Sequence, residues 1–133
     1  MKSLQVVAAI IQDGDTFLAT QRGYGDWKGW WEFPGGKIKQ GESAETALKR
    51  EILEELEMRI SVGEQLCTIQ TDYPDFHLTM HCFLCKIQEG EPVLREHEAL
   101  RWLKLEEMDA IRWLSADVEA IEKLKERFQE TTV

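Results

Sequence analysis

Short apolar runs separated by polar segments dominate the first third of the chain. The nearly continuous apolar run 5–11 predicts a buried strand, and residues 16–20 predict a second one. Residues 22–29 are polar and contain several glycines, which is typical of a loop. Residues 30–33 predict a short strand, which we expect to stop at a turn formed by residues 34–36.

The clearest helical pattern begins at Ser43 and runs to about Leu56. Its apolar residues recur at every fourth position and form one stripe: Ala44, Leu48, Ile52 and Leu56. Ser43 is a typical N-terminal cap, and the helix dipole favours a negative charge at Glu45 in the first turn. The segment therefore predicts an amphipathic helix.

Strand and helix patterns also alternate in the rest of the chain. Residues 61–71 and 77–87 predict two strands joined by a turn, and residues 100–103 predict a short strand. Residues 116–129 predict a second helix, whose apolar face comprises Val118, Ile121, Leu124 and Phe128. This order indicates one mixed α/β domain over residues 1–133, with helices packed on a sheet.

The net charge of −9 narrows the choice of partner. A nucleic-acid duplex is not expected, because phosphate backbones bind to basic surfaces. An acidic protein can bind a polyphosphate when divalent cations bridge the two. No apolar run approaches the ~20 residues that a membrane helix needs, and the N-terminus lacks the pattern of a signal peptide. We therefore expect no membrane partner and a cytoplasmic location.

Three cysteines, Cys67, Cys82 and Cys85, give an odd count. Without a secretion signal, this count favours free thiols in a reducing compartment. Cys82 and Cys85 have C-x-x-C spacing, but residues three apart in a strand face opposite sides of the sheet. The spacing therefore argues against a zinc or redox site formed by these two residues.

Three glutamates of the first helix cluster on one side. Glu51, Glu54 and Glu55 fall at positions i, i+3 and i+4, next to the apolar stripe, so we expect all three at the edge of the core. Like charges this close repel each other, and Mg²⁺ or Mn²⁺ removes that repulsion because both prefer carboxylate oxygens. The alternative is a solvated acidic face, which Glu57 extends.

The segments around the cluster favour the metal site. The glycines of residues 34–36 precede the helix and allow the backbone to approach a ligand closely. Arg50 lies one residue before the cluster, where it can hold Glu51 or Glu42 through a bidentate ion pair.

These residues resemble the Nudix box, G-x5-E-x7-R-E-U-x-E-E-x-G-U, in which U is a bulky apolar residue. The positions filled in register are Gly36, Glu42, Arg50, Glu51, Ile52, Glu54, Glu55 and Met58. The departure is Glu57, where the family has a glycine that ends the helix in a left-handed turn. Glu57 there implies either a strained cap or a slightly longer helix.

The resemblance extends over nearly the whole chain. Segments 31–38, 73–75, 77–79, 89–92 and 114–117 are similar to the MutT branch of the Nudix family. The resemblance implies the Nudix fold, a mixed β-sheet sandwiched between α-helices. It also implies hydrolysis of a nucleoside triphosphate at an internal phosphorus, which gives a monophosphate and pyrophosphate.

The resemblance also implies roles for the box residues. The metal, Mg²⁺ with Mn²⁺ as a possibility, would bind Glu51, Glu54, Glu55, the Gly36 carbonyl and Glu96 from a later loop. Glu51 or Glu96 would act as the general base, so that the catalytic set is Glu51, Glu54 and Glu96. Glu42 and Arg50 would orient the box. The alternative for Glu96 is an ordinary solvated loop residue.

Further residues are placed around the substrate by the same resemblance. Arg22 and Lys37 are candidates to hold phosphates, with surface charge as their alternative role. The base slot would comprise Leu4, Val6, Phe33, Tyr73 and Leu78. Asp117 would bind the base edge or cap the last helix. Trp27 and Trp30 would stack on the base or cover the core.

The preferred base stays open at this point. Enzymes that clear 8-oxoguanine nucleotides carry an arginine where this chain has Phe76, which cannot donate a hydrogen bond. Phe76, Asp117 and segment 95–100 are more similar to relatives that act on CTP and modified pyrimidines. Both substrate classes fit a role in nucleotide sanitisation and DNA repair.

Two rival functions also stay open. One is a Nudix hydrolase of ADP-ribose or a dinucleoside polyphosphate, and the other is a non-catalytic nucleotide-binding module. Retention of Glu51, Glu54 and Glu55 favours an enzyme. The expected partner is a small-molecule nucleotide, and the protein would be a monomer or a homodimer.

Overall fold

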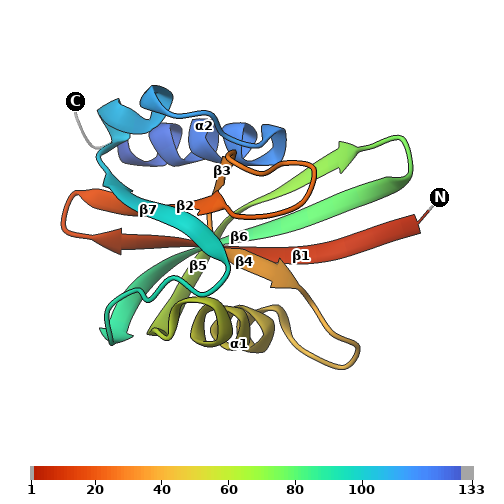
Figure 1. Cartoon of the computed structure of the whole chain (residues 1–133), viewed down its shortest axis with the longest axis horizontal. Coiled ribbons are helices and arrows are strands. Elements are labelled where there is room, and N and C mark those ends of the chain that lie inside the picture. The colour runs from red at the N-terminus through yellow and green to blue at the C-terminus, as the bar shows by residue number, and fades with distance from the viewer. Residues whose placement is uncertain (1, 130–133) are drawn as a thin grey trace.

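The computed structural model describes residues 2–129 and shows one mixed sheet between two helical layers (Figure 1). The strands are β1 (Lys2–Asp13), β2 (Thr16–Arg22), β3 (Trp31–Glu32), β4 (Gly35–Lys37), β5 (Arg59–Asp72), β6 (Phe76–Glu89) and β7 (His97–Leu103). The helices are α1 (Ala44–Leu56), the short 3-10 helix η1 (Leu105–Ala110) and α2 (Ser115–Gln129). This arrangement confirms the expected mixed α/β fold.

Strand β1 is the centre of the sheet, whose order is β3-β2-β1-β6-β5. One edge of β1 pairs with β6 in parallel from Lys2 to Gln12. Its other edge is shared, because residues 6–8 pair with β4 and residues 12–13 pair with β2. Strand β7 pairs with β2. The split at β1 opens the sheet beside β4.

The turn expected at residues 34–36 is wrong in part, because Gly35–Lys37 form strand β4. Any side chain at Gly35 would clash with the backbone carbonyl of Val7 on β1. Glycine therefore allows β4 to lie against β1, although the segment lacks the apolar pattern by which strands are usually recognised. Strands β1, β5, β6 and β7 extend beyond their predicted bounds for a related reason: pairing continues past the apolar runs.

Helix α1 covers one face of the sheet and begins as the sequence predicts. The Ser43 hydroxyl accepts a 3.1 Å hydrogen bond from the Thr46 backbone N–H. Leu48, Ile52 and Leu56 are buried in the core on this face. At its end Glu57 adopts a left-handed conformation, with φ 56° and ψ 33°. Of the two alternatives for Glu57, the strained cap is therefore the one that the structure shows.

Helix α2 covers the opposite face, and one member of its predicted apolar face is misplaced. Val118 is 43% exposed, whereas Asp117 is 4% exposed among buried Ala120, Ile121 and Leu124. Around the helix axis Asp117 lies about 20° from Leu124, and Val118 lies about 120° from it. An acidic residue therefore occupies the face that an apolar pattern assigns to hydrophobic side chains.

The cysteines are free thiols, as predicted. Cys82 belongs to the core under α2, and Cys85 belongs to the core under α1. The two residues thus face opposite sides of the sheet, which confirms that the C-x-x-C spacing builds no shared site. Within residues 2–129, no helix is both long and apolar enough to cross a bilayer.

Candidate active site

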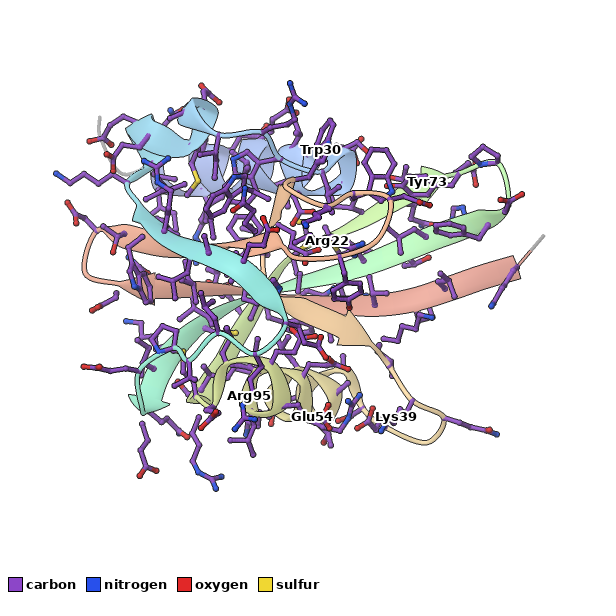
Figure 2. The ribbon with its side chains drawn as sticks, viewed as in Figure 1. Arg22, Trp30, Lys39, Glu54, Tyr73 and Arg95 are labelled. Atoms are coloured by element: carbon purple, nitrogen blue, oxygen red, sulfur yellow. The ribbon has the colours of Figure 1, made fainter. Side chains whose placement is uncertain are left out.

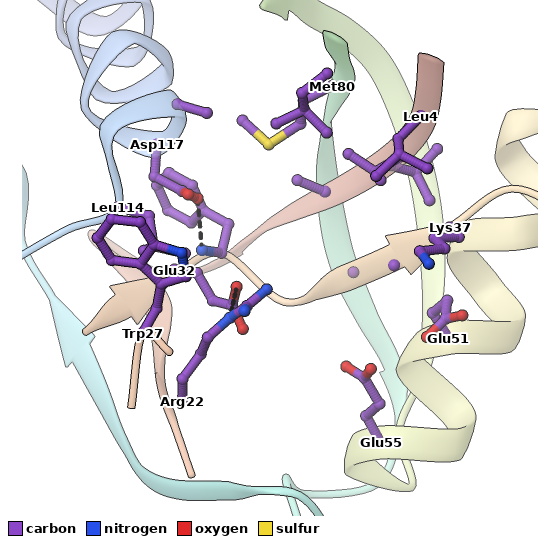
Figure 3. Close-up of a pocket in the computed structure, with 18 of the residues that line it drawn as sticks. Leu4, Arg22, Trp27, Glu32, Lys37, Glu51, Glu55, Met80, Leu114 and Asp117 are labelled. Carbon is purple, nitrogen blue, oxygen red and sulfur yellow. Dashed lines mark hydrogen bonds and ion pairs between the residues drawn. The ribbon is translucent and has the colours of Figure 1, made fainter. Parts of the chain in front are cut away.

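A cavity of about 630 Å³ lies where β1 and β4 meet, with α1 at one end and α2 at the other (Figure 3). Most of the residues singled out in the sequence line it: Leu4, Val6, Arg22, Trp27, Phe33, Gly36, Lys37, Glu51, Glu55, Tyr73, Phe76, Leu78, Glu96 and Asp117. Its walls come from both cores of the protein, because the sheet is open beside β4. One end is acidic and the other is apolar.

Glu51, Glu55 and Glu96 line the acidic end. Figure 3 shows the carboxylates of Glu51 and Glu55 extending from α1 into the cavity. A Cβ atom on Gly36 would lie within 2.7 Å of Glu51 Oε1, so only glycine leaves room for this carboxylate against the β4 backbone. The glycine that the sequence pattern places before the helix is therefore required by the position of Glu51.

Glu55 is a partly buried carboxylate at this end of the cavity. Burial raises its pKa to about 9, and the charge of Glu51 adds to the effect. Its Oε2 atom is buried and has no hydrogen-bond partner. An acid held in such surroundings is destabilised in its charged form unless a cation or a donor compensates it.

Glu54 does not share this environment. Its side chain is 55% exposed and does not line the cavity, and Figure 2 shows it on the outer side of α1. The expectation that all three glutamates lie at the edge of the core is thus wrong for Glu54. Around the helix axis it lies about 120° from Leu48, whereas Glu55 lies about 20° from Leu48.

Arg50 holds the start of the box together. Its Nε and Nη2 atoms donate to the two carboxylate oxygens of Glu42 at 2.7 and 2.9 Å, and Nη2 also donates to the Lys37 carbonyl. Nη1 lies 2.8 Å from Glu51 and 3.4 Å from Glu54. The pKa of Glu42 falls to about 2, chiefly through the hydrogen bond from Arg50. This geometry supports an orienting role for the pair.

The acidic end fits a hard divalent cation. Among residues 2–129, no three acidic, histidine or cysteine side chains already converge as a metal site. The donor set is nevertheless suitable, because Glu51, Glu55 and Glu96 offer carboxylate oxygens at one end of one cavity. The unpartnered Oε2 of Glu55 is the observation that most directly points to a cation ligand.

Two residues of this end were not predicted from the sequence. Glu32 accepts from Arg22 Nε at 3.0 Å, and its other oxygen lies 3.4 Å from His97 Nε2. His97 is 6% exposed at its side chain. Glu32 alternates with the buried Trp31 and Phe33, a pattern that is also typical of a solvated strand residue, so the local sequence contained no clear signal for its role. The two predicted phosphate-binding residues, Arg22 and Lys37, both line the cavity. Arg22 forms an ion pair with Glu32 there.

The apolar end is built from β6, the β5–β6 turn and α2. Tyr73 and Phe76 stack with ring centroids 4.8 Å apart, and Leu78 continues the same wall. Asp117 accepts a 2.9 Å hydrogen bond from the Phe33 backbone N–H through Oδ1. Burial raises the pKa of Asp117 to about 8. Because α2 begins at Ser115, Asp117 lies inside the first turn and is not its N-terminal cap.

The two tryptophans of the β2–β3 loop differ in their surroundings, and Trp30 belongs to neither hydrophobic core. Trp27 lines the cavity, whereas Trp30 is not among its lining residues. Trp30 contacts Trp27 edge-on with centroids 5.4 Å apart, and Arg112 lies over its ring at 4.9 Å. Trp30 therefore supports the loop, and Trp27 is the one in position to contact a ligand.

A family model described as the NUDIX domain matches residues 2–125. The chain belongs to the NUDIX family. An Escherichia coli (strain K12) protein named CTP pyrophosphohydrolase is similar to this NUDIX chain, with 37% identity over 123 residues that cover 92% of the chain and 91% of that protein. A protein of the same organism named 8-oxo-dGTP diphosphatase is 32% identical over 127 residues, which cover 94% and 98%.

Structural comparison agrees with the sequence comparison. The crystal structure of a MutT NUDIX hydrolase from Burkholderia pseudomallei matches this NUDIX chain with a TM-score of 0.84 at 28% identity, and the match covers 92% of this chain and 98% of that one. The family resemblance, the Nudix fold and the expectation of an enzyme are thereby confirmed. The chain is a NUDIX hydrolase with nucleotide pyrophosphohydrolases among its relatives.

Proposed function

We propose that this NUDIX hydrolase splits (d)NTPs into (d)NMP and pyrophosphate with Mg²⁺, and that its substrates are modified or oxidised nucleotides. The observation that carries the proposal is the polarity of the cavity. Carboxylates of α1 gather at one end, and an apolar slot with the buried Asp117 forms the other. The two parts of a nucleotide match these two ends, because its phosphates need cations and its base needs an apolar slot with a few polar groups.

The acidic end would hold the metal through Glu51, Glu55 and Glu96, with the Gly36 carbonyl beside them. Glu54, which lies outside the cavity, would be a more peripheral ligand. A bound divalent cation neutralises phosphate charge and polarises the phosphoryl group that is attacked. The buried, unpartnered Oε2 of Glu55 supports this assignment. NUDIX hydrolases generally need a divalent metal, and Mg²⁺ is the proposed one.

The chain's own residues would perform the remaining steps. Glu51 or Glu96 would accept the proton of the attacking water as a general base, since both line the cavity at the phosphate end. Lys37 would bind a phosphate oxygen. Arg22, which is paired with Glu32, would bring a second positive charge to the same region. Attack on an internal phosphorus releases pyrophosphate.

Asp117 would bind the base edge. Its Oδ1 is occupied by the Phe33 N–H, so Oδ2 is the atom left for the base. Burial raises the pKa of Asp117 to about 8, and a proton on Oδ2 would make that atom a donor to the base. Phe76 contributes an apolar surface to the same cavity. Relatives named CTP pyrophosphohydrolase and 8-oxo-dGTP diphosphatase support pyrimidine and oxidised-guanine nucleotides as the two substrate classes to test.

Pyrophosphate release with Mg²⁺ would be measured for dGTP, 8-oxo-dGTP, CTP, dCTP, 5-methyl-dCTP and ADP-ribose. A preference among the triphosphates would support the proposal and identify the base. Hydrolysis of ADP-ribose alone would replace it with the rival NUDIX activity. Tight nucleotide binding without any hydrolysis would favour the non-catalytic module.

A variant pair would connect the activity to the cavity. Glu51→Gln removes a carboxylate that lines it, and Glu45→Gln removes an exposed one from the first turn of the same helix, where Glu45 pairs with Lys49. We expect turnover to fall by orders of magnitude in Glu51→Gln and to stay near wild type in Glu45→Gln. Equal activity in the two variants would refute the assignment of the acidic end.

A further inference from the structure

Two of the three cysteines occupy directly opposed positions on neighbouring strands. Cys67 of β5 pairs with Cys82 of β6 in the antiparallel register. Opposed residues in such a pair have Cα atoms about 4.5 to 5.5 Å apart and side chains on the same face. A disulfide requires Cα atoms about 4.4 to 6.8 Å apart. The register of these two strands is therefore compatible with a bond between the two sulfur atoms.

The neighbouring pair confirms which face the two thiols occupy. Ile69 and Met80 are the next opposed residues on the same side, and both belong to the core under α2. Cys82 is fully buried in that core, whereas Cys67 is half-buried and packs against it. Cys67 is thus the partly exposed residue of the pair, and Cys82 is the buried one.

The environment of Cys67 favours its reactive form. The adjacent Cys82 thiol, acting as a hydrogen-bond donor, is the main cause that lowers the pKa of Cys67, and the positive charge of Lys123 on α2 acts in the same direction. The nearby Glu119 acts in the opposite direction. The same hydrogen bond, together with burial, raises the pKa of Cys82. The thiolate is the form of cysteine that attacks oxidants, so Cys67 is the more reactive of the two.

We propose that Cys67 and Cys82 form a dithiol site that hydroperoxides oxidise to an intrachain disulfide, with Cys67 as the attacked thiol and Cys82 as the resolving one. The proposal does not depend on the function proposed above. Cys85 is excluded from the site, because it lies on the opposite face of the sheet and its opposed residue on β5 is Val62.

The oxidation proceeds in two balanced steps. The Cys67 thiolate attacks one oxygen of hydrogen peroxide, an S–O bond forms, the O–O bond breaks, and the departing hydroxide takes a proton to become water. The Cys82 sulfur then attacks the sulfur of the Cys67 sulfenic acid. The S–S bond forms, the S–O bond breaks, and the Cys82 proton leaves with the hydroxyl group as a second water. Two thiols lose two electrons in total, and one peroxide is reduced to two waters.

The bridge would constrain one wall of the cavity. Segment 67–82 includes the β5–β6 turn, and its residues Tyr73, Phe76 and Leu78 line the apolar end. A disulfide that closes this segment reduces the freedom of the unfolded chain. We therefore expect the oxidised protein to unfold at a higher urea concentration than the reduced protein.

The test uses the full chain, fully reduced and then exposed to hydrogen peroxide without denaturant. The remaining thiols are alkylated after unfolding, and the intact mass is measured. We expect two thiols to disappear together without dimer formation, and dithiothreitol to restore both. Cleavage before Asp72 and Asp75 separates Cys67 from the other cysteines, and cleavage after Phe83 separates Cys82 from Cys85, so the linked fragments identify the bridge.

Three variants make the outcome decisive. Cys85→Ser is the matched control, and it should form the same bridge as wild type. Cys67→Ser should retain its thiols at the same exposure to peroxide. Cys82→Ala removes the resolving thiol without placing a hydroxyl in the core, and its Cys67 sulfenic acid should be trapped by dimedone. The proposal is overturned if all three thiols of the wild type persist, if Cys85 is in the linked fragment, or if the bridge joins two chains.

Discussion

The Oδ1 atom of Asp117 accepts a 2.9 Å hydrogen bond from the backbone N–H of Phe33, 84 residues earlier in the chain. Phe33 lies between β3 and β4 and lines the cavity. The bond therefore fixes α2 to the segment that leads into the Nudix box. It also explains how an acid is accommodated on the buried face of a helix, since one oxygen has a partner and the other faces a cavity.

The raised pKa of Asp117 predicts how stability depends on pH. The pKa is about 8 in the folded protein against an ordinary value of 3.8, so folding favours the protonated form. The contribution of Asp117 to the unfolding free energy is fully present below its pKa in the unfolded chain. It is lost as the pH rises through its pKa in the folded protein. Wild type should lose unfolding free energy across this range, at most about 1.4 kcal/mol per pH unit, and Asp117→Asn should lose less.

Urea unfolding of both proteins at about pH 5 and about pH 8 checks this prediction. The amide introduced by Asp117→Asn has the shape of the carboxyl group, so the variant keeps the packing. It does not titrate, so the variant removes only the pH dependence of this side chain. If the difference in stability between the two proteins stays constant over that range, Asp117 is already ionised at low pH and the prediction is wrong.

Glu55→Gln should make the protein more stable and less active at the same time. Burial and the charge of Glu51 raise the pKa of Glu55 to about 9. The free energy of folding is therefore less favourable with this acid than it would be with a neutral amide. Because the side chain is only partly buried, we expect a gain of about 1 kcal/mol in unfolding free energy at neutral pH. Addition of Mg²⁺ should raise the melting temperature of wild type more than that of the variant.

Glu45→Gln is the matched control, because Glu45 is an exposed glutamate of the same helix. Its stability and its response to Mg²⁺ should equal those of wild type. An equal rise in melting temperature with Mg²⁺ for wild type and Glu55→Gln would show that Glu55 does not contribute to cation binding.

Gly36→Ala should reduce turnover by about a hundredfold, since misplacing a reacting group by about 1 Å has an effect of that size. The added methyl group would meet the Glu51 carboxylate and displace it. Gly63→Ala is a stringent control, because its methyl group would meet the Leu84 backbone carbonyl away from the cavity and should disturb the fold more than the site. Steady-state kinetics and circular dichroism of both variants separate an effect on the site from general destabilisation. Normal turnover in a folded Gly36→Ala would contradict the prediction.

Glu57→Gly should stabilise the protein by about 0.5 kcal/mol. Relief of the left-handed strain contributes about 1 kcal/mol, and the greater freedom of glycine and the loss of the exposed ion pair to Arg95 offset part of it. Glu57→Ala removes the ion pair but keeps the strain, so it should be less stable than wild type. Chemical denaturation ranks the three proteins, and a glycine variant less stable than the alanine variant would be inconsistent with strain at this position.

The sequence predicted helix α1 and its glutamates because their signals are local, whereas the other cavity residues, such as Tyr73, Glu96 and Asp117, were placed by resemblance to the family. Ser43, the apolar stripe and the spacing of the glutamates all lie within one short segment. Strand β4 was mistaken for a turn because its glycines are selected by the close approach of β1, which is a long-range contact. A local pattern contains no information about that approach.

The errors on the two helices have a common physical origin. Apolarity placed Val118 in the core and charge grouped Glu54 with Glu55, but the position around the helix axis decides burial. Asp117 occupies a buried position because a backbone N–H from a distant segment is available to it. The roles of Glu32 and His97 likewise depend on β3 and β7 lying on either side of β2, which the chain order alone does not indicate.

The split pairing along β1 bears on how the nucleotide preference of this enzyme can change. Because β4 and β2 share one edge of that strand, the sheet opens beside β4, and the cavity there is bordered by two separate cores, one under each helix. The side chains proposed to recognise the base and those proposed to hold the metal therefore pack in different cores. On the proposed assignment, we expect exchange of residues in the layer of α2 to change the preferred nucleotide while the layer of α1 keeps its packing.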